Sequence, residues 1–182
     1  FEGQAGHGGQ LGQTNALTTV EKTVTVIEET LTKKFPNILF RHIIRQAGLI
    51  PTVTPSESRL WYATRGFDFP ETKLAYNEII KVAKSVSETL GIKIHHQLIS
   101  ETRGYLPNDT LGVELYESLK TIGPPKWSSE DLSFMKKLVS EIDPAAKMTL
   151  HRDIAFFNND ADYFGQDDGE VSWRIPLGRL NW

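Results

Sequence analysis

Two long amphipathic segments, separated by stretches rich in β-branched residues, limit the fold of this chain more than any other feature. In the first, residues 14–35, apolar side chains recur at spacings of three and four residues: Leu17, Val20, Val24, Ile27 and Leu31. This spacing predicts a helix with one apolar face. Thr14 or Asn15 can cap the helix at its start, and Pro36 ends it.

The second amphipathic segment, residues 68–91, carries clear signals at both ends. Asp68 is followed three residues later by Glu71, as in a capping box, and Pro70 falls in the first turn. Gly91 is suited to terminate the helix. The apolar stripe consists of Ala75, Ile79, Val82, Ala83, Val86 and Leu90.

Stretches rich in β-branched and aromatic residues predict strands at 38–48, 58–66 and 92–102. Residues 49–57 contain two prolines and predict a loop. If the opening FEGQ is the tail of a strand, the order of elements to residue 104 is β-α-β-β-α-β. This order predicts a chain of mixed helices and strands, α/β in the broad sense and α+β in its arrangement. It includes a ferredoxin-like domain, in which two helices cover one face of an antiparallel sheet.

The character of the chain changes after residue 104. Two capped helices are predicted at 108–123 and 128–143, and the chain from about 144 onward is irregular and partly acidic. We therefore predict a two-layer domain over 1–104 and a mostly helical fragment over 105–182.

Composition excludes several classes of protein. The 20 basic residues are scattered and the net charge is −3, which gives no basic footprint for nucleic acid. The absence of cysteine excludes disulfides, thiolate metal sites and a cysteine nucleophile. Apolar runs stay below the roughly 18 residues needed to span a membrane, and the start lacks a signal-peptide pattern, so we expect a cytoplasmic protein. The ends at Phe1 and Trp182 look like cuts through a longer polypeptide.

Several motif-like stretches fail when their context is considered. HRDIAFFN at 151–158 matches the catalytic loop of protein kinases, but the glycine-rich loop and the β3 lysine are missing. A calcium loop starting at Asn158 would place Tyr163 where glycine is required. His95 and His96 are adjacent on a predicted strand and point to opposite faces, so they cannot share a metal. The spacing of residues yields no complete metal site.

His7 is the candidate that remains. Glycines at positions 3, 6, 8 and 9 surround it and allow the backbone to approach a ligand closely. A histidine in this setting can present a hydrogen-bond donor to a group outside its own domain. On composition alone, an incidental histidine in a flexible terminus is the alternative.

FEGQAGHGG followed by NALTTVE resembles a segment of the M20 family of metal-dependent peptidases and amidohydrolases. In that family a strand of the form F-x-G-x-x-x-H leads into the first helix of a lid, or dimerisation, domain. GYLPND, GPPKW and DDGEVSW are similar to one branch, the aminobenzoyl-glutamate utilisation protein B type. The resemblance covers essentially the whole chain and is weakest at 144–165.

The resemblance implies part of an amidohydrolase that cleaves the amide bond of a small N-acyl amino acid, of aminobenzoyl-glutamate type. Two divalent metals, zinc or manganese, activate the attacking water in such enzymes. The family's metal ligands have no counterpart in this chain, so we expect the chain alone to bind no metal and to be inactive. The lid implies a homodimer, and a second, related subunit is a further candidate partner.

The resemblance also assigns roles to single residues. His7 matches the catalytic lid histidine, which reaches the partner's active site and stabilises the oxyanion. Arg65 matches an arginine that holds the substrate carboxylate. Gly48 marks the turn before a substrate-binding loop, and Thr52 stands where the family often has asparagine, which leaves the substrate in doubt.

In the DDGEVSW stretch, Asp168 and Ser172 match residues that help to shape the wall of the active site. An alternative function is a non-catalytic dimerisation or interaction module, because ferredoxin-like domains pair readily through helices or an edge strand. A kinase-like transferase is a third and more distant interpretation.

Overall fold

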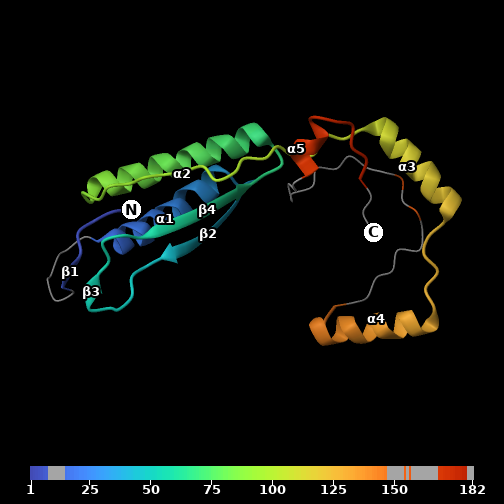
Figure 1. Ribbon diagram of the computed structural model, residues 1–182, viewed down its shortest axis with the longest axis horizontal. Helices are drawn as coiled ribbons and strands as arrows, with labels where there is room; N and C mark the ends of the chain where they lie inside the picture. Colours follow the sequence, from blue (N-terminus) through green and yellow to red (C-terminus); the bar gives the residue numbers. More distant parts are fainter. Residues whose placement is uncertain (8–14, 147–153, 155, 157–167, 180–182) are drawn as a thin grey trace. The chain divides into compact units, whose positions relative to one another are not determined.

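The computed structural model describes residues 1–7, 15–146, 154, 156 and 168–179. The kinase-like stretch 151–158 and the calcium-loop stretch from 158 fall almost wholly outside the described residues. Helices and antiparallel strands together give the α+β class predicted from the sequence (Figure 1). In the described part of the chain, no helix is both long enough and apolar enough to cross a membrane.

The described residues divide into two compact units. The first contains residues 1–7, 15–105 and 168–170, and the second contains 106–146, 154, 156 and 171–179.

The first unit contains both predicted long helices, α1 (Ala16–Lys34) and α2 (Phe69–Thr89). The Asn15 side chain accepts a hydrogen bond from the Thr18 backbone N–H at 2.8 Å, and the Asp68 side chain accepts one from the Glu71 N–H at 3.1 Å. Both caps satisfy N–H groups that have no partner inside the helix. Gly91, beyond α2, has a φ of 67°, a conformation that favours glycine.

The predicted strands at 38–48 and 58–66 are confirmed as β2 (Leu39–Gln46) and β4 (Arg59–Arg65), which pair in antiparallel. A second, smaller ladder joins β1 (Gly6–His7) to β3 (Val53–Thr54). β3 lies inside the stretch predicted as a loop, so that prediction is wrong at these two residues. A two-residue strand between prolines is too short to give a periodic signal.

The predicted strand over 92–102 is wrong. Lys93 forms an isolated bridge with Glu2, and no strand is formed from there to residue 102. A strand requires a neighbouring backbone with which to exchange hydrogen bonds, and residues 94–102 run past the sheet without one. The described strands therefore form two separate two-stranded ladders, and the ferredoxin-like detail is not confirmed.

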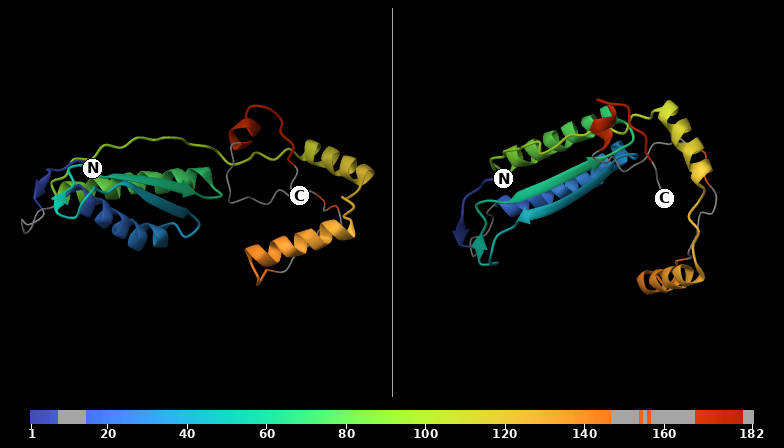
Figure 2. Two further views of the ribbon diagram at one scale, coloured as in Figure 1. Left: turned by 60° about the horizontal axis from the view of Figure 1, so that its bottom comes forward. Right: turned by 45° about the vertical axis from the view of Figure 1, so that its right-hand side comes forward.

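Helices α1 and α2 cover one face of the β2–β4 ladder (Figure 2). The core between these layers consists of Ile27, Leu31, Phe35, Ile38, Phe40, Ala75 and Ile79. Each large apolar side chain buried there stabilises the fold by about 1.5–3 kcal/mol. The same packing leaves the opposite face of the ladder open, with alternate residues of β4 exposed.

Glu78 links the two helices of the first unit. Its carboxylate accepts hydrogen bonds from the Lys34 ammonium of α1 at 2.7 Å and from Lys81 at 2.6 Å. These hydrogen bonds lower the pKa of Glu78 from 4.5 to about 2. Because the pKa is lower in the folded state, the stabilisation is present above pH 4.5 and is lost as the pH falls toward 2.

We therefore expect the melting temperature of the chain to fall more steeply between pH 4.5 and pH 2 than that of a Glu78→Gln variant. Thermal melts followed by circular dichroism across this range measure the difference. Glu88→Gln, an exposed position on the same helix, is the matched control and should retain the steep slope. Equal slopes for the chain and Glu78→Gln would contradict the prediction.

The second unit contains α3 (Asp109–Ile122) and α4 (Ser129–Ile142), as the sequence predicts. Asn108 caps α3, and Ser128 with Asp131 forms a complete capping box at α4. Neither helix contains a buried residue. Apolar side chains are exposed along both helices: Val113, Ile122, Phe134, Leu138 and Ile142.

Candidate functional site

His7 lies on the short β1–β3 ladder at one end of the first unit (Figure 1). The ladder sets His7 opposite Val53 and Gly6 opposite Thr54. The pairing uses backbone groups, and the His7 residue is exposed. A histidine held in this way can reach a group beyond its own unit.

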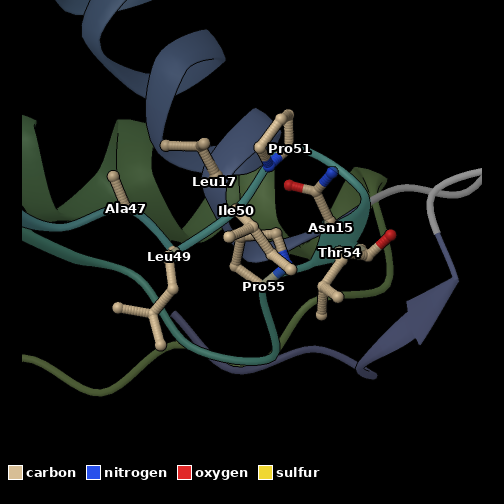
Figure 3. A pocket seen from close by; sticks show the side chains of 10 residues that line it. Asn15, Leu17, Ala47, Leu49, Ile50, Pro51, Thr54 and Pro55 are labelled. Carbon is tan, nitrogen blue, oxygen red and sulfur yellow. The ribbon is translucent and has the colours of Figure 1, made fainter.

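The loop that leads to β3 encloses a shallow hollow of about 430 Å³. Figure 3 shows Ile50, Pro51 and Pro55 of this loop gathered near Asn15 and Leu17, at the start of α1. Gly48 opens the loop with a φ of 104°, where a side chain would be strained. A methyl group at Gly48 would also lie 2.7 Å from Pro55 Cγ. The backbone at Gly48 is therefore one that glycine adopts more readily than any other residue.

Three of the predicted site residues share this end of the unit. Thr52 directly precedes β3, and Val53, the first residue of β3, faces His7 across the ladder. Gly48 begins the same loop. The structure thus brings His7 next to the residue that follows Thr52, although more than forty positions separate the two in sequence, and Gly48 begins the loop that leads to this ladder.

Arg65 lies elsewhere. It is the last residue of β4, opposite Leu39, whereas the loop containing Gly48 leaves the other end of the ladder, where Gln46 faces Arg59. At about 3.3 Å per residue, Arg65 is roughly 20 Å along the strand from Arg59. The structure therefore does not bring Arg65 together with His7 or Thr52 within one chain. Arg65 is exposed on the open face of the ladder.

Asp168 and Ser172 are the first and last residues of the short helix α5 (Asp168–Ser172). In the second unit, the buried Ser172 hydroxyl accepts a hydrogen bond from the Leu106 backbone N–H at 2.8 Å. This contact holds the start of the second unit in place, which is a structural role. Asp168 is half-buried.

Sequence reasoning missed Arg103 and Glu170. In the first unit, the Glu170 carboxylate accepts hydrogen bonds from the Arg103 backbone N–H at 2.7 Å, from Nε at 3.1 Å and from Nη2 at 2.8 Å. Hydrogen bonding to Glu170 raises the pKa of the Arg103 guanidinium. We call this contact the Arg103–Glu170 clasp. Its partners are 67 positions apart, so no local pattern could have revealed the pair.

The described residues contain no group of three or more histidine, aspartate or glutamate side chains that could hold a metal ion. A catalytic metal site needs about three converging protein ligands. The described residues therefore do not fit the divalent metals that the resemblance implies.

No family model matches the chain. The chain is similar to one of the subunits of the p-aminobenzoyl-glutamate hydrolase of Escherichia coli (strain K12), with 23% identity over 179 aligned residues. The match takes in 79% of this chain and 37% of the relative, so the chain spans well under half the length of the curated relative that it matches. This similarity confirms the resemblance indicated by the GYLPND, GPPKW and DDGEVSW stretches, and it supports a relationship with amidohydrolases.

Proposed function

We propose that this chain forms the lid and part of the catalytic domain of a metal-dependent amidohydrolase of the M20 type. The reaction is hydrolysis of the amide bond of an N-acyl amino acid, of the aminobenzoyl-glutamate type. The observation that carries the proposal is the similarity to a subunit of p-aminobenzoyl-glutamate hydrolase over 79% of the chain.

In this proposal His7 donates a hydrogen bond to the oxygen that becomes negatively charged when water attacks the amide carbonyl. Two observations support the role. His7 is exposed, and its strand is held by backbone pairing with β3, so the imidazole can be directed outward without loss of the strand. The neighbouring loop at Gly48 and Thr52 would contact the same substrate.

Arg65 binds the substrate carboxylate in this proposal, through the two parallel hydrogen bonds that a guanidinium offers. A small N-acyl amino acid cannot extend over the roughly 20 Å that separates the two ends of β4. His7 and Arg65 of one chain would therefore serve different active sites. This arrangement favours a homodimer in which each active site combines His7 of one subunit with Arg65 of the other. Asp168 would help to form the wall of the site.

When bound, the divalent metals would supply an activated water for the attack on the amide. Their ligands are assigned to a part of the polypeptide other than the described residues, or to a second, related subunit. The contribution of the described residues is to orient the substrate and to stabilise charge.

The test is hydrolysis of p-aminobenzoyl-glutamate by the complete polypeptide that contains this chain, with zinc or manganese supplied and the released glutamate measured by chromatography. We expect turnover of this substrate and at least about tenfold lower kcat/KM for the glutamine analogue, because that analogue lacks one of the carboxylates. Absence of hydrolysis for a panel of N-acyl amino acids with either metal would contradict the proposal. A dimeric but inactive polypeptide would favour the interaction module.

A further inference from the structure

Along β4, the open face of the β2–β4 ladder carries a tryptophan, a small residue and an arginine at alternate positions. Tyr62 packs against the core on the helix side, so Trp61, Ala63 and Arg65 lie on the face that α1 and α2 leave uncovered (Figure 2). All three residues are exposed, and Trp61 is 42% exposed. A large aromatic surface near the middle of this face is therefore available to a ligand.

A β-bulge in β2 places an arginine against this tryptophan. The register of the ladder shifts by one residue between Ile44 and Gln46, so Arg45 is the extra residue of the bulge. The guanidinium carbon of Arg45 lies 5.2 Å from the centroid of the Trp61 ring, within the range of a cation–π contact. Bulges re-aim side chains in this way. Ile43, which faces Trp61 across the ladder and is 55% exposed, adds a second apolar side chain.

The open face is positively charged, although the chain as a whole has a net charge of −3. Besides Arg45 and Arg65 it carries Arg41, which lies opposite Ala63 in the ladder. In the described part of the chain, no acidic side chain forms an ion pair with any of these three arginines. A face with unneutralised guanidinium groups around an aromatic ring attracts ligands that combine negative charge with a flat apolar group.

The spacing along β4 indicates how such a ligand is built. Trp61 and Arg65 are four residues apart on one face, which is about 13 Å along the strand. Both side chains are long enough to shorten this separation for a ligand above the sheet. Ala63, midway between them, has the smallest side chain of the three and leaves room above it. The order along the strand therefore suits an aromatic ring, a short linking group and a carboxylate.

We propose that Trp61 stacks against the acyl group of the substrate and makes the lid selective for aromatic over aliphatic N-acyl amino acids. The inference rests on the proposed function, in which Arg65 binds the substrate carboxylate. The aromatic ring lies against the exposed part of the indole, and the amide passes above Ala63. Arg45 is a positioning residue, because its guanidinium restrains the indole ring and adds a positive charge beside the stacked pair.

Ligand binding to the 182-residue chain tests the proposal without catalysis. The probes are p-aminobenzoyl-glutamate and N-acetyl-glutamate, which share the glutamate and differ in the acyl group. The NMR signal of the Trp61 indole N–H reports contact at the tryptophan. We expect p-aminobenzoyl-glutamate to shift this signal and to bind about tenfold more tightly than N-acetyl-glutamate, because an offset-stacked aromatic pair adds to the stability of the complex.

Four variants separate stacking from charge. Trp61→Leu should abolish the preference for the aromatic ligand, whereas Trp61→Phe should retain most of it. Arg45→Lys keeps the positive charge but removes the planar group, so the preference should fall about threefold. Trp127→Leu is the matched control, because Trp127 is 47% exposed and belongs to the second unit. The control should bind both ligands as the parent chain does.

Equal affinity for the two ligands, or an unchanged preference in Trp61→Leu, would overturn the proposal. A Trp61 signal that shifts with protein concentration alone would show that a second copy covers this face, and would overturn it as well. The proposed reaction can fail separately. Aromatic preference at Trp61, without hydrolysis by the complete polypeptide, would retain this site and reject the reaction. Hydrolysis without aromatic preference would retain the reaction and reject this site.

Discussion

Replacing His7 by alanine is expected to lower the kcat of the complete enzyme about 100-fold or more, because the developing oxyanion loses a hydrogen-bond donor. The fold should be preserved, since His7 is exposed and its pairing with Val53 uses the backbone. Metal content should be unchanged, since His7 belongs to no metal-binding group among the described residues. Steady-state kinetics, with metal content from elemental analysis and the fold from circular dichroism, measure the three quantities.

His96→Ala is the matched control, because His96 is also exposed and lies in the same unit without an assigned role. Its kcat should remain near that of the parent enzyme. An unchanged kcat in His7→Ala would remove His7 from the mechanism. Equal losses in both variants would point to a general disturbance of the lid.

Replacing Gly169 by alanine is expected to destabilise the first unit by about 3 kcal/mol. A β-carbon at this position would lie 2.1 Å from the Arg103 carbonyl oxygen, and a backbone atom cannot rotate away as a side chain can. Alanine favours a helix over glycine by about 1 kcal/mol, which is too little to offset the overlap. The Arg103–Glu170 clasp should open, because relief of the overlap requires α5 to move from the chain at Arg103.

Urea unfolding of the variant, compared with that of Gly104→Ala, measures this effect. Gly104 is next to Arg103 in sequence, but a β-carbon there would meet nothing within 4 Å, so the control should unfold close to the parent chain. Similar unfolding free energies for Gly169→Ala and Gly104→Ala would show that the close approach at Gly169 does not constrain the unit.

The helices could be predicted from the sequence because their signals are local. Asn15 and Asp68 accept hydrogen bonds from N–H groups three residues later, so a short window contains the whole interaction. The apolar faces of α1 and α2 repeat with the helical period, and their residues Ile27 and Ile79 lie in the core.

The strands show where local reasoning fails. Residues 92–102 have the composition of a strand, but pairing depends on a neighbouring edge that is distant in sequence, and Lys93 alone makes a bridge in that stretch. The Arg103–Glu170 clasp was missed for the same reason. Its residues are ordinary surface types, and only the folded backbone brings them within 2.8 Å.

The candidate site could be predicted only in part from the sequence. The glycines around His7 drew attention to it, but its role rests on the resemblance. The structure adds that His7 and Thr52 lie near one another, because β3 forms between two prolines with no pattern of its own. It also separates Arg65 from them along β4, which spacing in the sequence could not reveal.

The lack of buried residues in helices α3 and α4 has a calorimetric consequence. Heat capacity rises on unfolding mainly because apolar surface becomes hydrated, and these two helices contain no buried residue. Taken by themselves, they would melt gradually, with a small heat-capacity increment and a shallow dependence on denaturant. The sharp, heat-absorbing transition of this chain should therefore come from the first unit, where the layered core of α1, α2 and the β2–β4 ladder is broken up.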